Sequence, residues 1–202
     1  MKSRKGYKKL YDESFVLKNI ETIYNRCTSD DINNGRTWYE NAKSFSIYLS
    51  KKYNVTEIQS AGIIAALSPQ KSWINNMKIT EHFIESNGKA SVHTGTQLSK
   101  ASYILKNSLI TEEVYHILGG MKTKNFFYNI YNPDNNKAVT IDRHHLNVCY
   151  AEDIKGCTDK QYEFLKENTI IFANQINMIP SMLQATLWVC WKRIKSDFKW
   201  QN

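Results

Sequence analysis

Proline is scarce in this chain, and apolar side chains recur at helical spacing along most of its length. Pro69, Pro133 and Pro180 are the three prolines among 202 residues. Because proline is disfavoured inside helices and a 3.6-residue apolar repeat favours them, this pattern predicts a mostly helical protein. The short β-branched run at 139–141 cannot form a sheet alone. We therefore predict an all-α protein, with helices near residues 12–27, 36–53, 73–84, 97–108, 111–118, 122–131, 159–176 and 180–195.

One further helix is expected to be apolar on nearly all sides, through residues 61–67. Thr56 is a suitable N-cap for it, and Gln59 follows three residues later, as in a capping box. Pro69 disfavours helical backbone at Ser68, so the helix should stop there. A helix without a polar face has to be surrounded by other elements. We expect it to run through the centre of the protein, and we expect the two ends of the chain to pack together.

Positive charge is the main compositional signal. Lys and Arg total 27 against 19 Asp and Glu, a net charge of +8, and the sequence pI is near 9.2. This balance favours a polyanionic partner, nucleic acid first, although ribosomal and merely soluble proteins share it. Basic residues gather at both ends: Lys2, Arg4, Lys5, Lys8, Lys9, Lys192, Arg193, Lys195 and Lys199. They are candidates for phosphate contacts or, alternatively, for a solvated and partly disordered tail.

Composition also excludes several classes of protein. With 42% hydrophobic and 12% aromatic residues the chain can bury a core, which excludes wholesale disorder. No apolar run of about 18 residues is present, and the basic start lacks the apolar stretch of a secretory signal. Four scattered cysteines show no metal-ligand spacing. We expect a single cytoplasmic domain over residues 1–202, with a basic tail at 1–10 and no membrane contact, metal or cofactor.

Three segments carry residues suited to chemistry. Residues 118–125 read Leu-Gly-Gly-Met-Lys-Thr-Lys-Asn, a helix end, two glycines and a helix start. The free N–H groups of such a start can hold a phosphate. Gly119 and Gly120 let a nucleic-acid backbone approach closely, while Lys122 and Lys124 supply charge. An ordinary helical hairpin with a glycine cap accounts for the same residues.

The other two segments have similar alternatives. Asp142 follows the extended run at 139–141 and is well placed to cap a helix, while a metal interpretation of Asp142 and His144 lacks a third ligand. The polar turn after the central helix holds Ser68, Gln70 and Lys71. Gln70 is a candidate for insertion into a base stack or for a bond to a base edge, and a solvated loop is the alternative.

In this order the three segments resemble the helix-hairpin-helix DNA glycosylase superfamily, over residues 57–195. In that family an apolar helix ends in L-S-x-Q, a hairpin is followed by K-T-x-N, and a catalytic aspartate opens the next helix in V-D-x-H. The matching residues here are Ser68, Gln70, Lys122, Thr123, Asn125, Asp142 and His144. Lys122 and Asp142 stand 20 residues apart, close to the family's interval, and residues 99–105 resemble its S-K-A-x-x-I segment.

The resemblance implies an endonuclease-III-like fold of two helical lobes with a cleft between them, in a phage-type member without the iron–sulfur cluster. It implies a DNA glycosylase with abasic-site lyase activity on double-stranded DNA. Lys122 would be the nucleophile, and Asp142 would stabilise the oxocarbenium-like transition state. The implied DNA-binding residues are Ser68, Gln70, Lys71, Gly119, Gly120, Thr123, Lys124, Asn125, Arg143 and His144. The hairpin is shorter here than in the family.

Two other functions stay open on the sequence. A catalytically altered relative would bind DNA and recruit or inhibit a partner, and the shortened hairpin favours it. An enzyme on the same fold would instead modify a base without excising it. Retention of both Lys122 and Asp142 favours the glycosylase. Trp73 and Tyr128 are candidates for base stacking, with core packing as the alternative.

Overall fold

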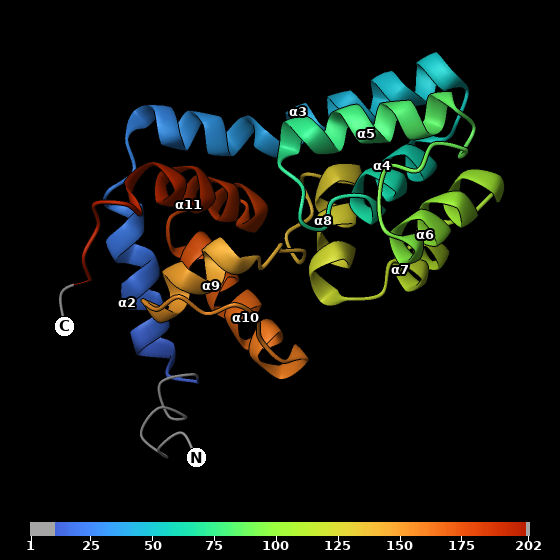
Figure 1. Cartoon of the computed structure of the whole chain (residues 1–202). Coiled ribbons are helices and arrows are strands. Elements are labelled where there is room, and N and C mark those ends of the chain that lie inside the picture. The colour runs from blue at the N-terminus through green and yellow to red at the C-terminus, as the bar shows by residue number, and fades with distance from the viewer. Residues whose placement is uncertain (1–10, 201–202) are drawn as a thin grey trace. The chain divides into compact units, whose positions relative to one another are not determined.

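The computed structural model describes residues 11–200, and helices make up most of this range (Figure 1). Within it no strand occurs, so the prediction of an all-α protein is confirmed. The basic residues between Lys2 and Lys9 lie outside the described range. The helices are α2 (Glu13–Tyr24), α3 (Ser29–Tyr53), α4 (Glu57–Ala66), α5 (Trp73–Glu85), α6 (Gly95–Lys106), α7 (Thr111–Leu118), α8 (Met121–Tyr131), α9 (Arg143–Tyr150), α10 (Asp159–Gln175) and α11 (Pro180–Ile194).

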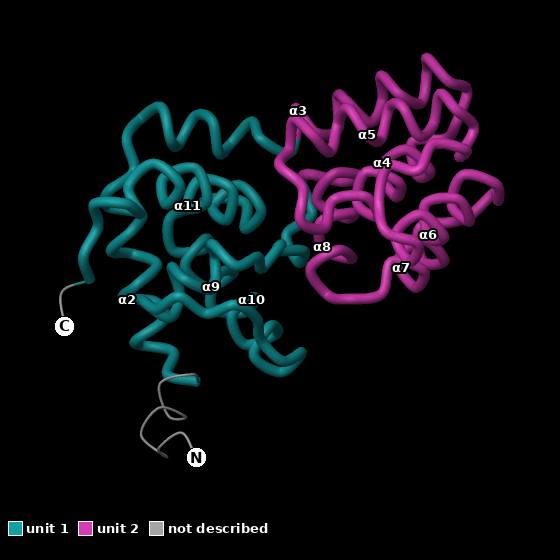
Figure 2. Tube along the Cα trace, in the orientation of Figure 1, with its two compact units in different colours: residues 1–39, 134–202 teal, residues 40–133 magenta. Residues whose placement is uncertain are grey.

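The chain divides into two compact units (Figure 2). Unit 1 combines Met1–Tyr39 with Asp134–Asn202, and unit 2 is the continuous stretch Glu40–Pro133. Helix α3 contributes its start to unit 1 and its remainder to unit 2. In unit 1, α2 packs on α9, α10 and α11, so for the described residues the prediction that the two ends of the chain pack together is confirmed.

Helix α4 forms the centre of unit 2, whereas the sequence predicted that it would run through the centre of the whole protein. It contacts α5, α6, α7 and α8, and every residue of 60–67 is buried. Gly62 lets α4 approach its neighbours closely, because a Cβ added there would lie 2.8 Å from Val114 and 3.3 Å from Ile104. The polar atoms beside this helix are paired: the Ser60 and Ser46 hydroxyls lie 2.7 Å apart, and the Asn76 amide donates to the Ile64 carbonyl.

Gln59 joins the start of α4 to the end of α6. The capping box predicted with Thr56 is present: the Thr56 N–H donates to Gln59 Oε1 at 2.8 Å, and the Gln59 N–H donates to the Thr56 hydroxyl. The Gln59 amide nitrogen, Nε2, lies within 3.2 Å of the carbonyls of Ile104, Leu105 and Asn107. One side chain therefore satisfies backbone groups at two helix ends.

The core of unit 1 is formed by α2, α9, α10 and α11. Val16, Ile20 and Ile23 on α2 are fully buried. The buried Asn19 amide donates to the Cys149 carbonyl at 2.9 Å and so satisfies the end of α9. These contacts fix α9, which carries one of the candidate functional segments.

The start of α3 differs from the sequence prediction, which placed it at residue 36 and was wrong. The helix begins at Ser29, where Thr28 and Asp31 bond each other's backbone N–H groups as in a capping box. Gly35 lies inside the helix and is required by packing. A Cβ at this position would lie 2.1 Å from the Thr186 hydroxyl and 2.4 Å from its Cα.

Candidate nucleic-acid interface

The extended run at 139–141 is held by one tyrosine of α10 rather than by a sheet. The Tyr162 hydroxyl donates to the Val139 carbonyl at 2.8 Å and accepts from the Ile141 N–H at 3.0 Å. Both flanking side chains, Val139 and Ile141, are buried. The backbone is thereby fixed in front of Asp142, the predicted catalytic aspartate.

Asp142 is the N-cap of α9. Its Oδ1 accepts from the His145 N–H at 2.9 Å, as the sequence predicts for a cap. The side chain is half-buried, and within residues 11–200 Oδ2 accepts no hydrogen bond. One oxygen thus has a structural role, and the other is available to a ligand. Arg143, the next residue, is exposed.

His145 beside it is structural. Its Nε2 lies 2.9 Å from the Thr169 hydroxyl, which donates its own hydrogen to the Leu165 carbonyl. Thr169 must therefore accept, so His145 carries its proton on Nε2. Nδ1 is buried without a hydrogen-bond partner in the described part of the chain. Complete burial lowers the pKa of His145 to about 4, against a weaker opposing effect of Asp142, and the ring is neutral.

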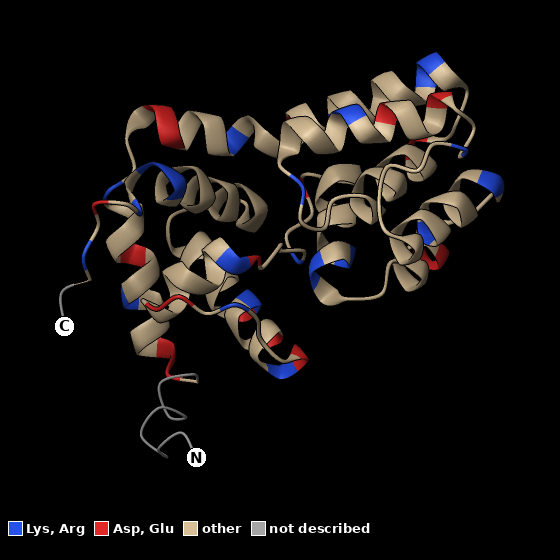
Figure 3. Ribbon diagram, in the orientation of Figure 1, with Lys and Arg blue, Asp and Glu red and all other residues tan. Residues whose placement is uncertain are grey.

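The His144 ring contacts α11, whereas the His145 ring contacts α10. Its ring packs edge-on against Trp188 of α11, with centroids 6.4 Å apart. Burial lowers the pKa of His144, and Lys195, Arg143 and Lys192 act in the same direction against the raising effect of Asp142. Basic residues mark the start of α9 and the end of α11 in the charge map (Figure 3). Sequence reasoning did not find Trp188 as a neighbour of His144, because the two helices are far apart in the chain.

The predicted hairpin joins α7 to α8 in unit 2. Gly119 ends α7 with φ of 85°, a conformation that favours glycine, and Gly120 precedes Met121 as the N-cap of α8. Gly120 has no side chain, so no cap bonds the first N–H groups of α8. Lys122 is exposed in this first turn. An uncapped helix start with an exposed lysine can bind an anion.

Neighbouring residues of the hairpin have structural partners. The Lys124 ammonium lies over the Tyr115 ring, 4.4 Å from its centroid. Asn125 is buried and donates to the Met121 carbonyl at 2.9 Å, so its amide stabilises the start of α8. Lys100, from the predicted S-K-A segment, donates to the Leu118 carbonyl at 2.8 Å and satisfies the end of α7. Thr123 is half-buried.

The turn after α4 presents Gln70 to solvent. The Ser68 hydroxyl donates to the Ala65 carbonyl, and the Lys71 N–H donates to the Ser68 carbonyl at 3.1 Å, which closes the turn. Gln70 itself is exposed at φ of 60°, in the left-handed region that disfavours residues with a side chain. His93 Nε2 donates to the Pro69 carbonyl at 2.9 Å and holds the turn in place.

The predicted site residues are distributed over both units. Ser68, Gln70 and Lys71, with the hairpin residues from Gly119 to Asn125, belong to unit 2, whereas Asp142, Arg143 and His144 belong to unit 1. The two aromatic candidates pack against neighbouring rings: Trp73 lies against Phe45, and Tyr128 lies 5.2 Å from Tyr115.

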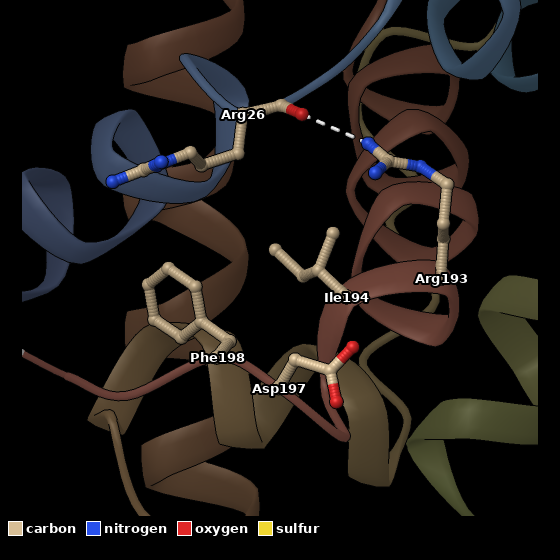
Figure 4. Close-up of a pocket in the computed structure, with 5 residues that line it drawn as sticks. All are labelled: Arg26, Arg193, Ile194, Asp197 and Phe198. Carbon is tan, nitrogen blue, oxygen red and sulfur yellow. Dashed lines mark hydrogen bonds between the residues drawn. The ribbon is translucent and has the colours of Figure 1, made fainter.

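A pocket of about 550 Å³ beside the end of α11 is separate from all of these residues. Its lining consists of Arg26, Arg193, Ile194, Asp197 and Phe198. Arg193 donates to the Arg26 carbonyl at 2.9 Å, and the Arg26 side chain extends away from it (Figure 4). Arg193 is a candidate phosphate contact from the sequence, but its guanidinium already bonds Asp31 and the Arg26 carbonyl, and none of the motif residues lines the pocket. We therefore do not assign the candidate site to it.

Neither a metal site nor a membrane span emerges from the described range. Across residues 11–200, His, Cys, Asp and Glu side chains do not gather in threes that could hold a metal ion. Over the same range, none of the helices combines the length and apolar character needed to cross a bilayer.

Comparison with known proteins identifies a family. A model of a family of unknown function, DUF7178, matches residues 4–195, and the chain belongs to this family. Comparisons with curated proteins and with solved structures gave no match.

Proposed function

We propose that this member of the DUF7178 family is a DNA glycosylase with abasic-site lyase activity, which removes a damaged or modified base from double-stranded DNA. Lys122 is the nucleophile in this proposal and Asp142 is the carboxylate that stabilises the transition state. The proposal combines the motif resemblance with the surroundings of these two residues.

The uncapped start of α8 is the observation that carries the proposal. Gly119 and Gly120 expose the first N–H groups of the helix, and Lys122 is exposed in the same turn. Backbone N–H groups and the helix dipole attract a DNA phosphate to this turn. In the proposal, Lys122 attacks the sugar that adjoins the phosphate held there.

The chemistry assigns one task to each residue. Unprotonated Lys122 Nζ attacks C1′, and the C1′–N bond breaks with its electron pair leaving on the base, which takes up a proton. The C1′–O4′ bond of the resulting amine adduct then breaks, with O4′ taking up a proton and Nζ losing one, which gives a Schiff base. Loss of a C2′ proton from the Schiff base expels the 3′ phosphate by β-elimination and cleaves the strand. Positive charge develops on the sugar before the new bond is complete, and the free Oδ2 of Asp142 is suited to stabilise it.

Gln70 supports the proposal through its backbone conformation. An exposed glutamine at φ of 60° is held in a disfavoured region by the bonds of the turn around it. Such strain is concentrated at functional sites. In the proposed complex Gln70 fills the gap that the displaced base leaves in the stack.

A second function is favoured by the N-cap bond of Asp142. Since Oδ1 accepts from the His145 N–H, the aspartate has a structural reason to be present without catalysis. This favours a protein that binds DNA without excising a base and that recruits or inhibits a partner. A base-modifying enzyme on the same fold stays a further alternative.

Trapping with borohydride distinguishes these functions. A duplex that contains an abasic site is mixed with the protein, and borohydride reduces any Schiff base to a stable adduct. The proposal predicts an adduct that Lys122→Ala abolishes and that Lys124→Ala retains. Lys124 is the matched control, because it lies two residues away on the same helix. DNA binding without an adduct in the wild-type protein would refute the lyase and favour binding alone.

A further inference from the structure

Three cations of unit 1 lie around His144 without an acidic partner. Arg143, Lys192 and Lys195 all act electrostatically on the His144 ring. All three are exposed, and in the described range none of them forms an ion pair. Asp142 is the one carboxylate that acts on the same ring. We call Arg143, His144, Trp188, Lys192 and Lys195 the α9–α11 face.

Trp188 holds one of these cations in position. The Lys192 ammonium lies over the Trp188 ring, 4.2 Å from its centroid. Trp188, Lys192 and the C-cap residue Lys195 are spaced four and three residues apart, and Lys195 keeps helical backbone, which places them along one side of the end of α11. The indole is itself packed between the rings of Trp38, 6.1 Å away, and His144. A lysine that is held on a packed indole loses less side-chain entropy when it binds an anion.

His144 adds a hydrogen-bonding group to the same face. The ring is half-buried, and its Nδ1 is buried without a hydrogen-bond partner in the described part of the chain. With its pKa lowered by burial and by the three cations, the free ring is neutral at physiological pH. An anion bound among these groups would offset the cations and favour protonation of the ring.

We infer that Arg143, His144, Lys192 and Lys195 bind a phosphodiester of the DNA strand beside Asp142, and that Trp188 is a positioning residue for the Lys192 ammonium. The inference rests on the proposed function, since it places the sugar–phosphate backbone next to the proposed catalytic aspartate. A backbone phosphate suits this face because three cations and one carboxylate act on the same His144 ring, so positive charge is in excess there. An arginine can also bond two phosphate oxygens at once.

The first experiment measures affinity for a fluorescent abasic duplex as a function of salt concentration. Each phosphate contact contributes about 0.9 to the slope of log K against log salt. Lys192→Ala is expected to weaken binding several-fold and to reduce this slope by about 1. Lys160→Ala is the matched control: its ammonium also lies over a ring of unit 1, that of Tyr11, at 5.6 Å. The control is expected to leave both affinity and slope unchanged.

Two variants of Trp188 test the positioning role. Trp188→Leu removes the ring while keeping all charges, and it is expected to weaken DNA binding about two- to fivefold, since an unheld lysine loses more entropy on binding. Trp188→Phe retains an aromatic face and is expected to restore most of the affinity. Equal weakening by both variants, with the fold intact by circular dichroism, would overturn the positioning role.

NMR of the His144 ring separates DNA from a free anion. The abasic duplex is expected to raise the pKa of His144, whereas inorganic phosphate at the same phosphate concentration is expected to leave it nearly unchanged. A larger effect of inorganic phosphate would overturn the inference in favour of a small-anion site.

The combined results distinguish failure of this inference from failure of the proposed function. A Lys122-dependent adduct together with wild-type affinity and salt slope in Lys192→Ala would overturn the inference alone. Absence of the adduct, together with the expected losses in Lys192→Ala, would overturn the lyase and leave the α9–α11 face as a DNA contact.

Discussion

Arg193 of α11 and Asp31 of α3 form an ion pair that joins the two chain segments of unit 1. Arg193 Nε lies 3.1 Å from Asp31 Oδ2 and 3.2 Å from Oδ1, and Nη2 bonds Oδ2 at 2.5 Å. The Asp31 side chain is 6% exposed, whereas that of Arg193 is 45% exposed. Burial opposes ionisation of Asp31, but bonds from Arg193 and Thr28 outweigh it, so the pKa of Asp31 lies below its ordinary value.

Arg193→Ala is expected to destabilise the protein by about 2–3 kcal/mol, because it leaves a buried carboxylate without its cation. Chemical denaturation measures the free energy of unfolding. The control is Lys52→Ala, which breaks the exposed pair with Glu81 and is expected to cost much less stability than Arg193→Ala. Equal losses in the two variants would contradict the role given to Asp31 burial.

The lowered pKa of buried His145 predicts that the stability of the protein depends on pH. The unfolded chain binds a proton at this ring below about pH 6.5, whereas the folded chain binds it only below about 4. The unfolded state therefore holds more protons between these values, and stability falls as the pH drops through this window, by at most about 1.4 kcal/mol per pH unit. The lowered pKa of His144 acts in the same direction.

Replacement of the His145 ring tests whether this histidine causes the loss of stability at low pH. His145→Gln keeps a donor for the Thr169 hydroxyl and removes the titrating group, so the loss of stability between pH 6.5 and 4 is expected to become shallower. Denaturation at several pH values measures it. His116→Gln, at an exposed position, is the control and is expected to leave the profile unchanged. An unaltered profile in His145→Gln would rule out His145 as the cause.

Gly35→Ala is expected to destabilise unit 1 severely, by about 3 kcal/mol or more, because the new methyl group would overlap Thr186. Thr186→Ala in the same chain is not expected to restore stability, since the Thr186 Cα and N lie within 2.5 Å of that methyl position. Thermal unfolding measures both variants. Gly95→Ala, which meets nothing within 4 Å at the start of α6, is the matched control. A mild effect at Gly35 would show that α3 and α11 pack less closely.

Gly120→Asp separates stability from DNA binding at the hairpin. A carboxylate at the N-cap of α8 satisfies its first N–H groups and is expected to stabilise the protein by about 0.5–1 kcal/mol. The same carboxylate would occupy and repel the proposed phosphate site, so DNA affinity is expected to fall at least tenfold. Fluorescence anisotropy and thermal unfolding measure the two effects. Undiminished affinity in this variant would exclude phosphate binding at α8.

Local signals in the sequence predicted much of the fold. Three signals mark helix ends through effects on near neighbours in the chain: the bonds of the Thr56–Gln59 capping box, the restriction that Pro69 places on Ser68, and the positive φ of Gly119. The start of α3 was missed although Thr28 and Asp31 form a similar local signal. Gly35 lies in the part of the helix that was missed, and its packing against Thr186 depends on a helix about 150 residues later.

The candidate site was predictable only in part, because some of its contacts join segments that are far apart in the chain. The capping role of Asp142 depends on the next three residues and could be predicted. The Tyr162 bonds that fix the preceding backbone, and the Trp188 ring beside His144, come from distant helices and could not. Asn125 matches the family motif and Lys124 stands at its variable position, yet their contacts with Met121 and Tyr115 are structural as well. A motif identifies residue types, whereas partners depend on packing.

The division of unit 1 into two chain segments has a consequence for synthesis on the ribosome. Helix α2 is made more than 100 residues before α9, α10 and α11, which cover it. At about 5–20 residues per second this interval lasts several seconds or longer. Unit 2 is continuous and can fold during that time. The apolar side chains of Val16, Ile20 and Ile23 stay exposed until α9, α10 and α11 have been synthesised. In the nascent chain, α2 is therefore the apolar segment that a chaperone would meet.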